Sequence, residues 1–135
     1  MSFIVDSSVI IAILTREDDV EPVAAFLLSD VPKFVSASTL MESGAVVGRK
    51  IGSEGLANLR TLLDKTQIET VPFDASQAEV GVQAYMRFGK GSGHRAKLNF
   101  GDCFSYALAR ISNLPLLFKG DDFIHTDIEP ALKPA

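Results

Sequence analysis

The sequence contains one cysteine, two histidines and no tryptophan. The lone cysteine, Cys103, excludes a disulfide within the chain and is consistent with a reducing compartment. A membrane-spanning helix needs about 20 consecutive apolar residues, and the apolar run from Val9 to Leu14 is far shorter. No basic segment precedes this run, so a secretory signal peptide is not indicated. These absences predict a cytoplasmic protein that does not contact a membrane.

An excess of basic residues is also missing. The formal net charge is −4 at pH 7, which argues against a protein that coats nucleic acid without selectivity. Cations are nevertheless concentrated in one glycine-rich stretch, RFGKGSGHRAK, which contains Arg87, Lys90, His94, Arg95 and Lys97 but no acid. The simplest interpretation of this stretch is a solvated loop. The alternative is a surface that binds phosphates.

What the sequence does contain is a regular alternation of β-rich and helical segments. With 135 residues, 47% of them hydrophobic, the chain is long enough for one domain, residues 1–135, with its own core. Short apolar runs predict strands at residues 3–6, 33–38, 68–73 and 114–120, and helical patterns occupy residues 9–14, 20–28, 39–50, 54–66, 74–88 and 98–110. Apolar strands separated by helices predict an α/β fold, with a parallel sheet of four to five strands and helices on both faces.

Polar side chains mark the expected helix starts. The candidate N-cap residues are Ser7 or Ser8, Ser53, Asp74 and Asn99. In the last helix, apolar residues recur at helical spacing and predict one buried stripe, formed by Phe100, Cys103, Phe104, Ala107, Leu108 and Ile111. Asp102 lies in the first turn of this helix, where a carboxylate also suits the positive end of the helix dipole.

Acidic residues stand close to one end of several predicted strands. Asp6 ends the first strand, and Glu42 lies in the first turns of the helix after the second. Asp121 and Asp122 follow the fourth strand, and Asp102 opens the helix that precedes it. The functional crevice of a parallel α/β sheet lies outside the carboxyl ends of its strands. We therefore expect these acids to meet at one edge, although each also has a simpler use as a cap, a solvated side chain or a turn residue.

Carboxylates that meet in this way repel one another unless a cation neutralises them. Oxygen ligands without histidine or cysteine suit Mg²⁺ or Mn²⁺ rather than zinc. Such an ion activates a water and offsets charge on a phosphodiester. The chemistry predicted from these residues is therefore phosphodiester hydrolysis. The first strand leads into DSSV rather than G-x-G-x-x-G, which disfavours a dinucleotide-binding fold.

Four segments of the sequence resemble the PIN-domain ribonucleases, in particular the VapC toxins of bacterial toxin–antitoxin pairs. They are FIVDSSVIIAIL, SASTLMESGAVVGRK, YMRFGKGSGHRAKLNFGDCFSYALAR and LPLLFKGDDFIHTDI, which together span nearly the whole chain. The third is the most specific, because a loop of basic residues and glycine that leads into LNFGDCFSYALA is typical of one VapC subgroup.

Transferred by position, the resemblance implies that Asp6 and Asp102 are the principal Mg²⁺ ligands and that Glu42 is the third acid. Many PIN domains carry an aspartate where this chain has Gly120, and Asp122 is the expected fourth acid, with Asp121 as a substitute. Whether one or two ions bind stays open. Binding of substrate phosphates is expected at the basic residues Arg87, Lys90, Arg95 and Lys97, with His94 as a further contact.

The resemblance also implies an activity and its partners. The expected function is a Mg²⁺-dependent endoribonuclease that cleaves structured RNA, such as transfer or ribosomal RNA, by a metal-activated water. A VapB-type antitoxin and a second copy of the chain are the expected protein partners. Two alternatives stay open: a catalytically eroded module that binds RNA or a partner protein, and a Mg²⁺-dependent DNA nuclease or phosphatase. The chain has no room for the cap domain that phosphatases of related topology generally carry.

Overall fold

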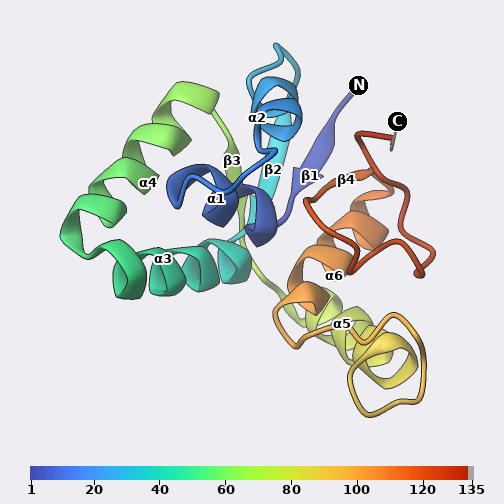
Figure 1. Ribbon diagram of the computed structural model, residues 1–135. Coiled ribbons are helices and arrows are strands. Elements are labelled where there is room, and N and C mark those ends of the chain that lie inside the picture. Colours follow the sequence, from blue (N-terminus) through green and yellow to red (C-terminus); the bar gives the residue numbers. More distant parts are fainter. Residues whose placement is uncertain (134–135) are drawn as a thin grey trace.

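The sheet consists of four short parallel strands in the order β3–β2–β1–β4 (Figure 1). The strands are β1, Phe3–Val5; β2, Lys33–Ser36; β3, Glu69–Val71; and β4, Leu116–Leu117. The computed structural model describes residues 1–133, so Pro134 and Ala135 of the predicted domain lie outside the described residues. The expected α/β fold with a four-stranded parallel sheet is confirmed, with strands shorter than predicted.

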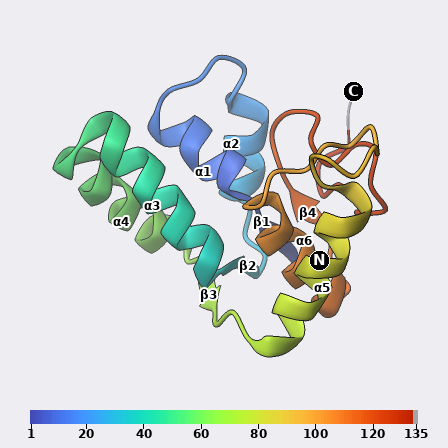
Figure 2. The same cartoon turned by 90° about the horizontal axis from the view of Figure 1, so that it is seen from below.

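Six helices surround this sheet in the described part of the chain. They are α1, Ser7–Leu14; α2, Glu21–Leu27; α3, Ala37–Ile51; α4, Ser53–Thr66; α5, Ala75–Phe88; and α6, Asp102–Ser112. In Figure 2, α5 and α6 lie on one side of the sheet, and α1 to α4 lie on the other. None of the helices within residues 1–133 has the length and apolar character needed to cross a bilayer.

The sheet separates two apolar layers because successive side chains of a strand point to opposite faces. Ile4 packs with Phe88 and Tyr106 from α5 and α6. Its neighbours Phe3 and Val5 pack in the other layer, with residues of α1, α2 and α4 such as Val9, Leu27 and Leu59. Both faces of β1 are therefore buried, and the chain that leaves its carboxyl end is held in place from two sides.

Three of the predicted helix starts are wrong by one or two residues. Asp6, in extended conformation, is the N-cap of α1 in place of Ser7 or Ser8, and its carboxylate accepts a hydrogen bond from the Ser8 N–H. Glycines hold the N-cap positions of α4 and α6, in place of Ser53 and Asn99. The prediction for α5 is confirmed, because Asp74 Oδ1 accepts the Gln77 N–H at 2.9 Å.

The predicted stripe on α6 is correct at its centre and wrong at its ends. Cys103, Ala107 and Leu108 are buried, whereas Phe100 is 68% exposed and Ile111 is 47% exposed. Phe100 precedes the helix, and its ring contacts the edges of Tyr85 and Phe104 at the surface. Helical periodicity identifies the face of a helix but not how far the neighbouring elements cover it.

The helix that carries Glu42 packs closely against α4 at Gly55. A Cβ at this position would lie 2.7 Å from Val47 Cγ1 and 3.1 Å from the Val47 carbonyl oxygen, so Gly55→Ala must push α3 and α4 apart. We expect Gly55→Ala to lower the free energy of unfolding by about 1–3 kcal/mol, measured by urea denaturation.

Gly48→Ala is the matched control for this substitution. Its Cβ would meet only the Leu56 side chain, at 3.5 Å, which is an ordinary contact. Alanine is favoured over glycine by about 0.5–1 kcal/mol inside a helix, so this variant should gain stability or stay unchanged. Equal losses in both variants would contradict the close contact at Gly55.

Candidate active site

The predicted acids lie at the carboxyl edge of the sheet. Asp6 follows β1 directly and begins α1, while Ser36 ends β2 and begins α3, which carries Glu42. Asp122 follows β4, and Asp102 is the first residue of α6. Helix and strand ends therefore bring side chains from four separate segments of the sequence to one edge, as the topology of a parallel sheet predicts.

Asp6 is the most deeply buried of these acids, with 2% of its surface exposed. Its Oδ1 accepts the Ser105 hydroxyl at 2.6 Å, and its Oδ2 accepts the Ser8 N–H at 3.0 Å. Burial raises the pKa of this carboxyl, and the hydrogen bonds from Ser105 and Ser8 oppose that rise. Each oxygen has one protein donor, so each keeps lone-pair capacity for a further ligand.

Asp102 is also buried, with 8% of its surface exposed. Its Oδ2 accepts the Asn99 N–H at 2.8 Å, so Asn99 serves the acid rather than capping the helix. Burial and then repulsion from Asp6 raise the pKa of Asp102 to about 7, with further repulsion from Asp122 and Glu42. The other three predicted acids, Asp6, Glu42 and Asp122, therefore all act on this carboxyl group.

Glu42 is half-buried, and its carboxylate lies directly against Gly101. Burial and then repulsion from Asp6 raise its pKa, and a hydrogen bond from Ser7 opposes the rise. Its Oε1 is buried and has no hydrogen-bond partner among the described residues. A Cβ at position 101 would overlap this carboxylate, so a side chain there would displace Glu42 from its present position.

The loop after β4 contains two candidate fourth acids, both exposed. Asp122 contributes to the raised pKa of Asp102, which places its charge near the other acids. Asp121 instead accepts the Ile124 N–H with its backbone carbonyl and so forms part of a turn. Of the two, Asp122 is the one whose charge acts on the carboxylate cluster.

The cluster fits a divalent cation in its charge and its donors. Glu42 Oε1 is a buried oxygen without a partner among the described residues. Burial raises the pKa values of Asp6, Glu42 and Asp102, and repulsion from Asp6 adds to the rise for Glu42 and Asp102. Carboxylate oxygens are the ligands that Mg²⁺ and Mn²⁺ prefer. With the side chains as they stand, residues 1–133 contain no three His, Cys, Asp or Glu residues grouped tightly enough to hold an ion.

The basic stretch divides into a loop and a helix end. The loop is closed by two backbone hydrogen bonds, from the Lys90 N–H to the Leu98 carbonyl and from the Leu98 N–H to the Phe88 carbonyl. The side chains of Lys90, Arg95 and Lys97 are exposed. His94 has a local structural role, because its ring packs on Phe88 and its Nδ1 accepts the Ala96 N–H.

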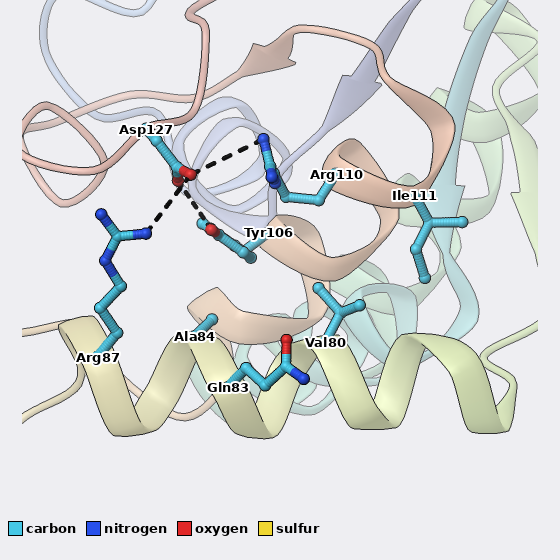
Figure 3. Close-up of a pocket in the computed structure, with 8 residues that line it drawn as sticks. All are labelled: Val80, Gln83, Ala84, Arg87, Tyr106, Arg110, Ile111 and Asp127. Carbon is cyan, nitrogen blue, oxygen red and sulfur yellow. Dashed lines mark hydrogen bonds and ion pairs between the residues drawn. The ribbon is translucent and has the colours of Figure 1, made fainter.

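Arg87 is not part of this loop, because it lies in the last turn of α5 (Figure 3). Its guanidinium lies 3.8 Å from Asp127 Oδ2, and Arg110 lies 3.7 Å from the same oxygen. The Tyr106 hydroxyl donates to Asp127 Oδ1 at 2.7 Å. Arg87 therefore helps to hold the C-terminal segment on α5 and α6, a use that the charge pattern alone does not indicate.

Two buried hydroxyl residues beside the acids are absent from the predicted site. Ser105 and Thr39 are fully buried, and their side-chain oxygens lie 3.3 Å apart. Their spacing in the sequence is the one pattern that could have identified them: Ser105 is three residues after Asp102, and Thr39 is three residues before Glu42. Residues at this spacing share a helix face.

The family model for the PIN domain matches residues 3–129. The chain belongs to the PIN-domain family, and the resemblance stated from the sequence is confirmed. Ribonuclease VapC42 of Mycobacterium tuberculosis is 44% identical over 128 residues, which cover 95% of this chain and 98% of that protein.

Two solved structures show the same fold. One is M. tuberculosis VapC20, described as a toxin that cleaves the sarcin–ricin loop, with a TM-score of 0.74, 18% identity, and coverage of 93% of this chain and 95% of that one. The other belongs to a toxin–antitoxin complex from Klebsiella pneumoniae, with a TM-score of 0.65, 17% identity, and coverage of 93% and 92%.

The raised pKa of Asp102 predicts a pH-dependent stability. Between the ordinary value of 3.8 and about 7, the folded chain keeps a proton that the unfolded chain has lost. The stability of the wild type must therefore fall as pH rises through this window. Asp102→Asn carries no such charge, so without divalent ions its Tm should exceed that of the wild type by several degrees above pH 7.

The difference in Tm between Asp102→Asn and the wild type should shrink toward pH 4, where the carboxyl of the unfolded wild-type chain also takes up protons. Thermal unfolding at several pH values in EDTA measures it, with the pH 4 comparison as the internal control. A difference in Tm that is constant from pH 4 to pH 8 would show that Asp102 does not carry the repulsion described above.

Proposed function

We propose that the protein is an endoribonuclease of the VapC type, the toxin of a toxin–antitoxin pair, which hydrolyses phosphodiester bonds in structured RNA with Mg²⁺ or Mn²⁺. The observation that carries the proposal is the convergence of Asp6, Glu42 and Asp102 at one edge of the sheet. Burial raises all three pKa values, and repulsion from Asp6 adds to the rise for Glu42 and Asp102. Its second support is the match, over nearly the whole chain, to a relative named as a VapC ribonuclease.

In this proposal Asp6 and Asp102 hold the ion, because both are buried and each keeps unused lone pairs. Mg²⁺, when bound, supplies a Lewis acid that offsets charge on the phosphate and lowers the pKa of water. Glu42, whose Oε1 has no partner among residues 1–133, accepts a hydrogen bond from the attacking water and orients it. Asp122, in the loop after β4, helps Glu42 to orient water.

The basic loop supplies the affinity for RNA that the acidic edge lacks. Lys90, Arg95 and Lys97 are exposed on the segment that leads into Asp102. Cations at this place hold phosphates on either side of the one that reacts, and fix the position of the chain without reading its sequence. The products should carry a 5′-phosphate, because water rather than a ribose hydroxyl attacks.

The proposal extends to the protein partners. A VapB-type antitoxin is proposed because one solved structure with this fold is a toxin–antitoxin complex. A homodimer is proposed from the family resemblance alone. Size-exclusion chromatography of the chain alone and with its antitoxin tests both.

Cleavage should depend on the ion and on both aspartates. We expect EDTA to abolish cleavage of a structured RNA, and Mg²⁺ or Mn²⁺ to restore it. Asp6→Asn and Asp102→Asn should each lower the rate on the order of 100-fold or more, because each removes a ligand of the ion, which supplies several kcal/mol of charge stabilisation. Asp64→Asn, on the exposed face of α4, is the matched control and should cleave at the wild-type rate.

Parallel assays on DNA and on small phosphate esters distinguish the proposed ribonuclease from a DNA nuclease or a phosphatase. Full activity of Asp102→Asn would reject the proposed metal site. Products that end in 2′,3′-cyclic phosphate would reject attack by water while leaving ribonuclease activity in place.

Loss of one cation from the loop should weaken RNA binding in a salt-dependent way. Arg95→Gln is the preferred variant, because Arg95 is exposed and its φ is not positive, whereas Lys97 has a φ of 51°. In an Asp102→Asn background, which prevents cleavage, we expect the slope of log K against log salt to fall by about 1.

Arg60→Gln removes an exposed charge from α4 and is the control. Filter binding at several salt concentrations measures both variants. An unchanged slope for Arg95→Gln would favour the interpretation of the stretch as a solvated loop.

A further inference from the structure

Beneath the acids lies a chain of buried hydroxyl groups that the proposed chemistry does not use. The Ser105 hydroxyl donates to Asp6 Oδ1 at 2.6 Å, and Thr39 Oγ1 lies 3.3 Å from Ser105 Oγ. Ser105 and Thr39 are both fully buried. A serine hydroxyl has a single proton. Because Ser105 gives this proton to Asp6, Thr39 must be the donor in the second bond, and the chain runs from Thr39 through Ser105 to Asp6.

This chain connects the three elements that carry the buried acids. Thr39 and Glu42 are three residues apart on α3, and Asp102 and Ser105 are three residues apart on α6. At this spacing each hydroxyl lies on the same helix face as the acid of its own helix. The third member, Asp6, joins β1 to α1. A displacement of α6 would therefore break the bond to Asp6, and a displacement of α3 would break the bond between Thr39 and Ser105.

The direction of these bonds is unusual for buried helical hydroxyls. Serine and threonine inside helices commonly donate back to a carbonyl four residues earlier. Ser43 and Thr66 do so in this chain, to the carbonyls of Thr39 and Leu62. The Ser105 hydroxyl instead leaves its own helix for a carboxylate, and Thr39 turns toward Ser105.

We propose that Thr39 and Ser105 are positioning residues, which fix the carboxylate of Asp6 in the orientation that receives the divalent cation. The proposal rests on the proposed function and adds two residues to its site. With Ser105 on Oδ1 and the Ser8 N–H on Oδ2, both oxygens of Asp6 are held, and rotation of the carboxylate would break both bonds. Groups that orient metal ligands in this way typically contribute about 10–100-fold to metal affinity or activity.

The test measures Mg²⁺ binding to the purified chain by calorimetry, beside cleavage kinetics on one RNA. Ser105→Ala should weaken Mg²⁺ binding about 10–100-fold and lower kcat, with KM for RNA unchanged because the basic loop is intact. Thr39→Val keeps the side-chain shape but removes the donor, and it should weaken Mg²⁺ binding in the same direction. Thr39→Ser restores the hydroxyl and should bind Mg²⁺ with nearly wild-type affinity.

Ser43→Ala and Thr66→Val are the matched controls, because each removes a buried hydroxyl that bonds only within its own helix. Both should keep wild-type Mg²⁺ affinity. Wild-type affinity in Ser105→Ala and Thr39→Val, or an equal loss in the controls, would overturn the positioning role and leave the proposed function standing. A wild-type chain that binds no Mg²⁺ and cleaves no RNA would overturn both.

Discussion

Mutual repulsion between buried carboxylates is the constraint on which the site of this protein depends. Asp6 and Asp102 are almost fully removed from water, and Glu42 is half-buried beside them. Burial and like charge together raise the pKa of Asp102 to about 7. A fold that only needed stability would replace such a group with a neutral one, because unpaired buried charge is costly. A cation bound between these acids neutralises their repulsion, and this would explain why they lie together at one edge of the sheet.

Asp6 connects the fold to this edge. It follows β1 directly, caps α1 and carries the most buried carboxylate of the site, so one residue sets the direction of the chain and the position of the charge. The elements around it are short, and β1 has only three residues. Because both faces of β1 are covered by apolar layers, this short strand still gives Asp6 a fixed place. The hydrogen bond from the Ser105 hydroxyl then ties the carboxylate of Asp6 to α6.

Much of this arrangement can be predicted from the sequence, because it follows from topology. Parallel strands end at one edge, so the acids after each strand must approach one another, and the structure brings Asp6, Glu42, Asp102 and Asp122 into one electrostatic cluster. The structure differs where tertiary contacts decide. Asn99 follows the rules for an N-cap, yet its N–H donates to Asp102. Phe100 lies before α6 and is exposed, although its spacing fits the apolar stripe. Arg87 belongs to the basic stretch in sequence but pairs with Asp127, forty residues later in the chain. Such pairings leave no local pattern in the sequence.

The ion is the part of this scheme that can be observed most directly. Crystals soaked in Mn²⁺ should show an anomalous scattering peak within about 2.5 Å of carboxylate oxygens from both Asp6 and Asp102. A soaked crystal with no peak between these two residues, and with manganese bound only elsewhere, would contradict a shared cation as the reason for their burial.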